Sequence, residues 1–320
     1  MRKQLLEDAT RTLRQGRFAV SDTCNIRPKS FDVVARRGEM VLLLKVLVNI
    51  DGLDADTAAE MKALSAHLGA ESLVVGTKTS DHELEDGVLY LRRGVPAMSR
   101  GTAHDYFVEG VPPLVYMGSG GLYVNIDGDL LEDARDDEEM SLGAVANELG
   151  VSRRAISKYE DGMDATLEVA LRLEEMFGES LISPVEVFGE EGEGEGEDSE
   201  GGDKKAEEVP EDETERRVFA ILRGAGFDVV PTSRAPFRAL SREGEADDDE
   251  TVLTGTDARG SDIVKRARLM SSISDVARTR SVYVVEDKTA RDSIEETKIV
   301  DVEEIEDVEG SEEFLSRIES

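Results

Sequence analysis

Apolar residues recur at helical spacing at the start of the chain and form strand-like runs after it. The helical set ends near Gly16 and consists of Leu5, Leu6, Ala9 and Leu13. Spacings of three and four residues place side chains on one face of a helix, so this stretch predicts a helix. Two runs rich in valine and leucine, at residues 31–35 and 41–48, then flank a polar turn, which predicts a β-hairpin.

The next elements complete a layered domain. Residues 57–68 predict a helix that ends at Gly69, and residues 73–75 predict a buried strand. An order of helix, strands, helix and strand is typical of an α/β domain, in which helices cover a sheet. We therefore predict an α/β N-terminal domain over residues 1–110, followed by a β-hairpin arm over residues 111–126.

The segment from residue 142 to residue 161 has the pattern of two helices packed across a tight turn. Gly150 lies in the turn, where a positive φ favours a residue without a side chain. Ser141 and Ser152 precede the two helices, and each can accept a hydrogen bond from a backbone amide left unpaired at the helix start. The apolar residues spaced to face inward are Val145, Leu149, Val151, Ile156 and Tyr159.

Together with the sequence from Tyr159 to Gly162, these residues resemble the Cro and lambda-repressor family of helix-turn-helix domains. The resemblance covers residues 127–188 and implies an all-α domain of five helices. Arg135 and Glu160 stand where that family pairs an arginine of its first helix with the glutamate that closes its recognition helix, so they would brace the two helices. The five helices are expected at residues 130–138, 142–149, 152–159 and 166–177, with a short one from Pro184.

The same resemblance implies which residues read DNA. The family reads bases from the start of its recognition helix, and the matching positions here are Arg153, Arg154 and Lys158, with Ser157 close by. Arginine is suited to paired hydrogen bonds with guanine in the major groove. We therefore expect this short basic stretch to carry the sequence specificity.

Phosphate contacts and two departures from the family pattern complete the expected interface. Ser141 and Ser152 would contact phosphates through their hydroxyls and the helix-start amides. Leu142 replaces the glutamine common at the first position of the second helix, and Asp161 and Asp164 stand where basic residues often contact phosphate. These departures lower the expected affinity for phosphate, so base contacts would carry more of the binding.

Acidity is the feature that argues against DNA binding. The chain has 71 Asp and Glu against 38 Lys and Arg, a net charge of −33. DNA-binding proteins are ordinarily basic because cations release the counterions condensed on phosphates. The excess fits either a disordered acidic protein or a folded protein from a salt-loaded cytoplasm, where salt screens self-repulsion. The periodic apolar runs favour the second interpretation, a halophilic protein whose DNA binding gains little from a basic face.

Other features indicate a cytoplasmic protein. Cys24 is the single cysteine, so no internal disulfide forms. Residues 1–17 carry charges throughout and lack the apolar core of a secretion signal. No apolar stretch is long enough to span a bilayer, and we expect no membrane contact. The three histidines, at positions 67, 82 and 104, lack metal-ligand spacing, so we expect neither a metal site nor a cofactor.

Residues 189–214 are poor in apolar residues and rich in Gly and Glu, which predicts an acidic disordered linker. The remaining residues, 215–320, have the size of one further α/β domain. This C-terminal domain either repeats the N-terminal domain or merely shares generic strand composition with it. The segments that suggest a repeat are residues 13–18 with 222–227, and residues 74–79 with 284–289.

Asp32 and Lys45, on the two strands of the first predicted hairpin, are similar to the core of PD-(D/E)XK nucleases. That core needs an aspartate and then an acid two residues before the lysine, because paired carboxylates hold Mg²⁺ and the lysine positions the attacking water. Leu43 takes the place of the acid, and Glu39 in the turn is a poor substitute. We therefore expect a nuclease-like fold without catalytic residues, and residues 251–254 of the C-terminal domain offer no such trio.

The whole arrangement resembles a family of archaeal HTH-type transcriptional regulators that place a Cro-type domain after an N-terminal α/β domain. It implies a regulator that reads the major groove of double-stranded DNA, as a homodimer because this domain type reads paired half-sites. Two alternatives stay open: a DNA-processing enzyme of the restriction-nuclease-like class, and an acidic protein-interaction module. No pattern in the sequence points to a particular effector.

Overall fold

The computed structural model describes residues 1–178, 181–189, 212–243, 250–256, 263–286 and 291–319. These residues form two compact units. The first contains the described residues of Met1–Leu47, Gly52–Val74 and Gly201–Ser320, and the second contains those of Val48–Asp51 and Val75–Glu200. The linker expected at residues 189–214 falls mostly outside the described residues, and a helix already begins at Glu213.

The first unit opens with helix α1 (Arg2–Gln15) and the antiparallel strands β1 (Ala19–Val20), β2 (Val33–Arg37) and β3 (Met40–Val46). Helix α2 (Ala55–Leu68) follows, and β4 (Ala70–Gly76) begins in this unit. The carboxylate of Asp54 caps α2 by accepting a hydrogen bond from the Thr57 amide at 2.8 Å. Gly69 ends the helix in the left-handed conformation. The elements expected in this part of the chain are therefore present.

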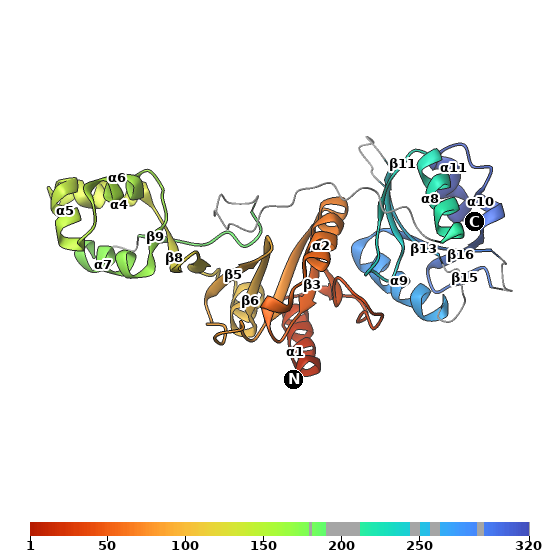
Figure 1. The fold of residues 1–320 in the computed structure, drawn as a ribbon, viewed down its shortest axis with the longest axis horizontal. Helices are drawn as coiled ribbons and strands as arrows, with labels where there is room; N and C mark the ends of the chain where they lie inside the picture. Colours follow the sequence, from red (N-terminus) through yellow and green to blue (C-terminus); the bar gives the residue numbers. More distant parts are fainter. Residues whose placement is uncertain (179–180, 190–211, 244–249, 257–262, 287–290, 320) are drawn as a thin grey trace. The chain divides into compact units, whose positions relative to one another are not determined.

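The rest of the first unit is the C-terminal α/β domain (Figure 1). Its strands lie in the order β11-β12-β13-β14-β16-β15, with β13, β14 and β16 parallel and the other neighbours antiparallel. Helices α8, α10 and α11 pack on one face of the sheet and α9 on the other. The strands are β11 (Phe227–Pro231), β12 (Ala239–Glu243), β13 (Thr251–Thr256), β14 (Arg280–Val285), β15 (Ser293–Ile294) and β16 (Thr297–Asp301). The helices are α8 (Glu213–Gly224), α9 (Ile263–Ala277), α10 (Val302–Ile305) and α11 (Ser311–Glu319).

The C-terminal domain repeats the N-terminal domain. In both, a helix leads into three antiparallel strands, then into a second long helix and a further strand. The strand register relates the copies residue by residue, since Ala19 lies opposite Arg36 in the first and Asp228 lies opposite Arg242 in the second. Generic strand composition alone does not reproduce a register, so we interpret the two domains as copies of one unit.

Side-chain contacts recur in the two copies as well. The hydroxyls of Ser65 and Ser72, at the end of α2 and in β4, lie 2.7 Å apart. The hydroxyls of Ser274 and Ser281, at the matching places in α9 and β14, lie 3.1 Å apart. The same hydrogen bond therefore ties the long helix to the following strand in each copy.

The two copies bury equivalent faces against each other. Helix α2 of the first copy packs on β12 of the second, and α9 of the second packs on β2 of the first. The same surface of each copy forms the contact, which is the arrangement found at a two-fold interface between identical subunits. The first unit is thus an intramolecular pseudo-dimer. Its shared apolar core takes matching residues from both copies, namely Phe31 and Phe237, Val34 and Leu240, and Leu43 and Leu253.

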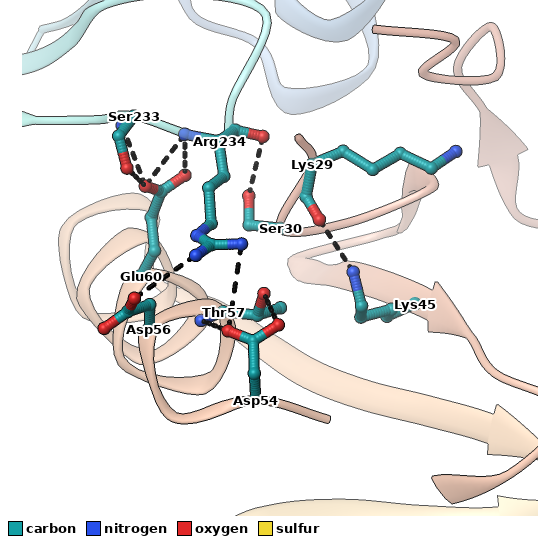
Figure 2. A network of polar contacts seen from close by, with 9 residues as sticks. All are labelled: Lys29, Ser30, Lys45, Asp54, Asp56, Thr57, Glu60, Ser233 and Arg234. Atoms are coloured by element: carbon teal, nitrogen blue, oxygen red, sulfur yellow. Dashed lines mark hydrogen bonds and ion pairs between the residues drawn. The ribbon is translucent and has the colours of Figure 1, made fainter. Parts of the chain in front are cut away.

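A polar network also joins the copies, at the start of α2 (Figure 2). The Glu60 carboxylate accepts hydrogen bonds from the backbone amides of Ser233 at 2.9 Å and Arg234 at 3.0 Å. The Arg234 guanidinium lies 3.2 Å from Asp56. The backbone carbonyl of Arg234 accepts a hydrogen bond from the Ser30 amide at 2.9 Å. These directional contacts fix the register in which the apolar faces meet.

The second unit begins with a short 3₁₀ helix, η1 (Ile50–Gly52), whose last residue belongs to the first unit. A hairpin of β5 (Val88–Arg92) and β6 (Val95–Ser99) leads into α3 (Arg100–His104), which continues as a π-helical turn, η2 (Asp105–Glu109). Strand β7 (Val115–Gly118) is parallel to β5 and antiparallel to β8 (Gly121–Ile126). This hairpin leads the chain into the helical domain.

The helical domain contains α4 (Gly128–Asp137), α5 (Leu142–Leu149), α6 (Arg153–Glu160) and α7 (Leu167–Phe177) (Figure 1). Two short strands, β9 (Ala165–Thr166) and β10 (Ile182–Ser183), pair with β8. Val124 and Ile126 of β8 belong to the apolar core between the helices. The hairpin expected as an arm over residues 111–126 therefore also forms one wall of this domain.

The short helix expected from Pro184 is not formed, and this prediction was wrong. The Pro184 carbonyl instead accepts a hydrogen bond from the Asn125 side chain at 3.3 Å, and the Val185 amide donates to the Pro113 carbonyl at 2.8 Å. These distant partners satisfy backbone groups that a helix would pair internally. The two residues before Pro184, Ile182 and Ser183, pair antiparallel with Ile126 and Asn125 of β8.

Candidate nucleic-acid interface

Helix α6, the expected recognition helix, has one buried and one exposed side. Ile156 and Tyr159 are buried in the core of the helical domain, whereas Arg153, Arg154 and Lys158 are exposed. Since residues three and four apart share a helix face, the buried pair fixes the side of α6 that turns to solvent. The structure therefore gathers the three predicted cations on one exposed surface. Ser157 is half-buried beside them.

These three cations have no acidic partner among the described residues, although acids outnumber bases almost two to one in the chain. Many other arginines of the described residues are paired, as Arg2, Arg135, Arg234 and Arg280 show. A guanidinium or ammonium without a carboxylate keeps its donors available for a phosphate or a base edge. This exposed, unpaired surface of Arg153, Arg154 and Lys158 is the candidate nucleic-acid interface.

Both helices of the motif begin with a serine cap. Ser141 accepts a hydrogen bond from the Ala144 amide at 3.2 Å at the start of α5, and Ser152 accepts one from the Ala155 amide at 3.1 Å at the start of α6. Gly150 ends α5 with φ of 70°, which the turn requires. The caps fix where each helix starts, and each satisfies one of the backbone amides that have no partner within the helix.

Arg135 and Glu160 lie in direct contact. The Arg135 Nε donates to Glu160 Oε1 at 2.6 Å, and its Nη1 donates to the Met140 carbonyl at 3.1 Å. Both side chains are nearly enclosed, with exposed fractions of 12% for Arg135 and 11% for Glu160. The hydrogen bond to Glu160 is the main cause of the raised pKa of Arg135. The pair joins α4 to the end of α6 and so restrains the orientation of α6.

Gly128 provides a second contact between α4 and α6, which the sequence did not reveal. A Cβ at this position would lie 2.1 Å from the carbonyl oxygen of Glu160. Only glycine permits so close an approach of two backbones. The start of α4 and the end of α6 are therefore in van der Waals contact directly beside the Arg135 and Glu160 pair.

Arg172 of α7 is a further residue that sequence reasoning missed. Its guanidinium donates to the carbonyls of Glu148 at 2.5 Å and Leu149 at 2.8 Å. These carbonyls close α5 and have no partner within the helix, so a cation there satisfies them and complements the helix dipole. Arg172 thus holds α7 against the turn of the motif.

The Asp164 carboxylate, expected near a DNA phosphate, has a partner within the protein. It accepts a hydrogen bond from the Tyr116 hydroxyl at 2.5 Å, and burial together with this carboxylate raises the pKa of Tyr116. The Tyr116 ring in turn stacks on Tyr123, with ring centroids 5.8 Å apart. The loop after α6 is therefore tied to the β7–β8 hairpin, while Asp161 remains exposed.

The nuclease-like site of the N-terminal domain holds a single acid, and that acid is already paired. Asp32 is fully buried and contacts Arg2 Nη2 at 2.7 Å and Lys29 Nζ at 2.5 Å. It also accepts a hydrogen bond from the Val46 amide at 2.7 Å. Leu43, where a second acid is needed, is buried in the apolar core. A divalent cation needs several oxygen ligands, so these residues do not fit one.

Lys45 does not take the position of a catalytic lysine beside two carboxylates. Its Nζ donates to the Lys29 carbonyl at 2.7 Å (Figure 2), and burial lowers its pKa. In the C-terminal copy the strand register places Arg238 at the position of Asp32 and Gly255 at that of Lys45. Neither copy therefore presents the acid, acid and lysine trio.

No group of three or more His, Cys, Asp or Glu side chains in the described part of the chain is arranged to hold a metal ion. No helix of the described residues is both long enough and apolar enough to cross a membrane.

Known protein families match two parts of the chain. A helix-turn-helix family matches residues 131–182, and a PD-(D/E)XK superfamily domain matches residues 2–113. The chain therefore combines a helix-turn-helix domain with a PD-(D/E)XK-type domain, as the fold and the two sites indicate.

Curated relatives resemble the chain over almost its whole length. The relative from Halobacterium salinarum is 51% identical over 98% of this chain and 95% of its own. Those from Natronomonas pharaonis and Methanosarcina acetivorans are 51% and 44% identical, over 99% and 98% of this chain and 98% and 96% of their own. Each carries the provisional name HTH-type transcriptional regulatory protein. The chain belongs to this family of archaeal HTH-type transcriptional regulatory proteins, and its acidity fits the salt-loving members. No solved structure matches it.

Removing one partner of the Arg135 and Glu160 pair should destabilise the helical domain. We expect Glu160→Gln to cost about 3 kcal/mol of unfolding free energy, because the Arg135 charge would stay enclosed without its counter-ion. Denaturant titration in KCl measures this. Glu132→Gln is the matched control, since Glu132 lies 3.9 Å from the same arginine but is largely exposed, and it should cost under about 0.5 kcal/mol. Equal effects of the two variants would contradict the proposed brace.

Adding a methyl group at Gly128 should separate α4 from α6. Gly128→Ala is expected to cost about 1–3 kcal/mol because the new Cβ overlaps a backbone oxygen that cannot rotate away. Gly143→Ala is the control, since its nearest neighbour is 3.8 Å from the added Cβ, and alanine raises helix propensity there by up to about 1 kcal/mol. Thermal unfolding of both variants gives the comparison, and a stabilised Gly128→Ala protein would refute the close contact.

Proposed function

We propose that this protein is a sequence-specific transcriptional regulator whose helix α6 reads bases in the major groove. The observation that carries the proposal is the exposed surface of Arg153, Arg154 and Lys158, which no acid neutralises within the described residues. Ser157 lies at its edge, and Ser141 and Ser152 supply hydroxyls and helix-start amides for phosphates. Arg135 and Glu160 brace the helix that presents these donors.

The acidity of the rest of the chain is compatible with this function at high salt. Counterion release contributes little when the bulk salt concentration is molar, so a broadly basic face would add little affinity. Hydrogen bonds from arginine to guanine do not depend on counterion release, and each correct pair is worth about 1–3 kcal/mol of discrimination. Binding would therefore rest on a few direct base contacts.

The partner is double-stranded DNA, and the active form is a homodimer. A helix-turn-helix domain covers one half-site, and two copies bind half-sites one helical turn apart. The expected operator is a pair of inverted half-sites. A cytoplasmic location, where the DNA is, follows from the same proposal.

Replacing both arginines should remove operator recognition. We expect Arg153→Ala with Arg154→Ala to weaken operator binding by roughly thirtyfold or more and to erase the footprint, because two base-reading side chains are lost. Footprinting in molar KCl on sites selected from random DNA measures this, and the wild-type footprint should cover two half-sites.

The control is Arg216→Ala with Arg268→Ala, which removes the same charge from exposed helix positions of the C-terminal domain. It should leave the footprint intact. An unchanged footprint in the Arg153 and Arg154 variant would overturn the proposal. Absence of any DNA binding by the wild-type protein in molar KCl would favour an acidic protein-interaction module instead.

We further propose that the PD-(D/E)XK-type domain has no nuclease activity and serves as a structural part of the protein. The arrangement that supports this is Asp32 enclosed by Arg2, Lys29 and the Val46 amide, with Leu43 in place of the second acid. A carboxylate held by two cations has little capacity left for Mg²⁺.

Purified protein incubated with linear and branched DNA and Mg²⁺ or Mn²⁺ should therefore leave both substrates intact. Asp32→Ala should lower stability by several kcal/mol, because Arg2 and Lys29 would lose the carboxylate that neutralises them. The decisive result against this proposal is cleavage by the wild-type protein that disappears in Asp32→Ala while the variant remains folded.

A further inference from the structure

The pseudo-two-fold interface of the first unit has two ends, which are equivalent by symmetry. At each end, the last turn of the long helix of one copy meets the first two strands of the other. The strand register makes Ala19 and Arg36 of the first copy equivalent to Asp228 and Arg242 of the second. The two ends can therefore be compared position by position.

The end formed by α2 is closed by a side-chain pair. His67, in the last turn of α2, places its Nε2 3.1 Å from the Asp228 carboxylate of β11. Its Nδ1 lies 2.9 Å from the Ala63 carbonyl of the preceding turn. The imidazole thus bridges the helix and the opposite strand. The pair lies at the surface, with exposed fractions of 27% for His67 and 70% for Asp228.

The end formed by α9 is open. The serine pairs that align the two helices make Val276 equivalent to His67, and Ala19 stands where the other end has Asp228. Two small apolar side chains cannot bridge this space. A pocket of about 250 Å³ remains in their place, lined by Ala19, Arg36, Gly38, Asp275, Val276 and Arg278.

Arg36 forms a fixed wall of this pocket. Its Nη1 donates to the Ala277 carbonyl at the end of α9 at 3.0 Å, and its Nε donates to the Gly38 carbonyl at 2.9 Å. The side chain is only 14% exposed, whereas its acidic neighbour Glu39, 3.4 Å away, is 93% exposed. An exposed glutamate holds a cation weakly. The guanidinium is therefore preorganised and still able to bind another anion.

Arg278 supplies a second guanidinium from a strained backbone. Its φ is 58°, a left-handed conformation that costs free energy for any residue with a side chain. The equivalent position after α2 is Gly69, with φ of 55°, which is the ordinary solution for a helix end. The Arg278 side chain is exposed and has no ion pair with another described residue. A strained arginine where the sister copy uses glycine indicates a role beyond folding.

We propose that this pocket binds a small organic anion. A carboxylate or phosphate group would accept hydrogen bonds from the two guanidiniums of Arg36 and Arg278, the geometry for which arginine is suited. Asp275 on the rim offers an acceptor for a hydroxyl or amino group of the same molecule. The lining holds these two arginines and one acid, and the second nearby acid, Glu39, is 93% exposed beside Arg36.

The helix end itself opposes an anion, because the last carbonyls of a helix carry partial negative charge. Arg36 offsets this by donating to the Ala277 carbonyl. A ligand bound here would contact both copies at once and stabilise their docked arrangement. The site does not depend on DNA binding by the helical domain, so the two proposals can fail separately.

Isothermal titration calorimetry on the full chain in KCl tests the proposal. Citrate and L-glutamate serve as carboxylate probes, and inorganic phosphate and glycerol 3-phosphate as phosphate probes. At least one class should bind the wild-type protein with one site per chain. The class that binds identifies the anionic group. Failure of all four probes to bind would overturn the proposal.

Three variants locate the binding. Arg278→Gly installs the residue of the sister position, so it should unfold at the same or a higher temperature yet bind the probe about tenfold or more weakly. Ala19→Asp with Val276→His rebuilds the closed pair of the other end and should also abolish binding. Arg268 is an exposed arginine of α9 outside the pocket, and the Arg268→Ala variant should bind the probe as the wild type does. Equal affinity of Arg278→Gly and the wild type would exclude this pocket as the site.

Discussion

Mutual burial of two equivalent apolar faces is the constraint on which the first unit depends. In each α/β copy, the sheet face on which the copy's own long helix lies also contacts the long helix of the other copy, since α9 packs on β2 and α2 packs on β12. The matched residues Phe31 and Phe237 meet in the same core for this reason. Because the contact is reciprocal, neither copy can shift without uncovering the other. The network around Glu60 and Arg234 then selects one register among the alignments that apolar contact alone would allow.

Many cationic side chains of the described residues form ion pairs with acids of the same chain. In the first copy, Arg2 at the start of α1 pairs with the buried Asp32 before β2. In the second copy, Glu215 in the first turn of α8 lies 3.9 Å from Arg238, which holds the place of Asp32. The same two elements are thus joined by an ion pair of reversed polarity. The cations of α6 differ, because no carboxylate among the described residues pairs with them.

The parts of the fold that were predictable are those whose determinants lie close together in the sequence. Two serine caps, a turn glycine and a three-to-four-residue apolar spacing define α5 and α6, and the structure has both helices within a residue of the expected bounds. The segment from Pro184 was mistaken for a helix because its backbone bonds to Asn125 and Pro113, more than fifty residues earlier. Gly128, Arg172 and Tyr116 were missed for the same reason. Each acts through contacts with distant backbone or side-chain atoms, and such contacts leave no periodic pattern in the sequence.

The nuclease-like site could also be predicted only in part from the sequence. The absence of a second acid could be read directly from Leu43. That Asp32 would be occupied could not be predicted, because Arg2 lies thirty residues away on a helix whose placement depends on the whole sheet. The repeat was visible only as short similar segments. Register and the recurring serine hydrogen bond, which are properties of the folded chain, distinguish copying from shared composition.

Fusion of the two copies in one chain also changes what a single mutation can do. In a dimer of identical subunits, a substitution at the interface appears at both ends together, so a cavity opened at one end is opened at the other and the loss of packing is doubled. In this chain the two ends are encoded separately. One could retain His67 and Asp228 as a stabilising closure while the other accumulated Ala19, Val276 and a strained Arg278. With both copies in one chain, the residues at one end of the interface can change while the residues at the other end continue to hold the copies together.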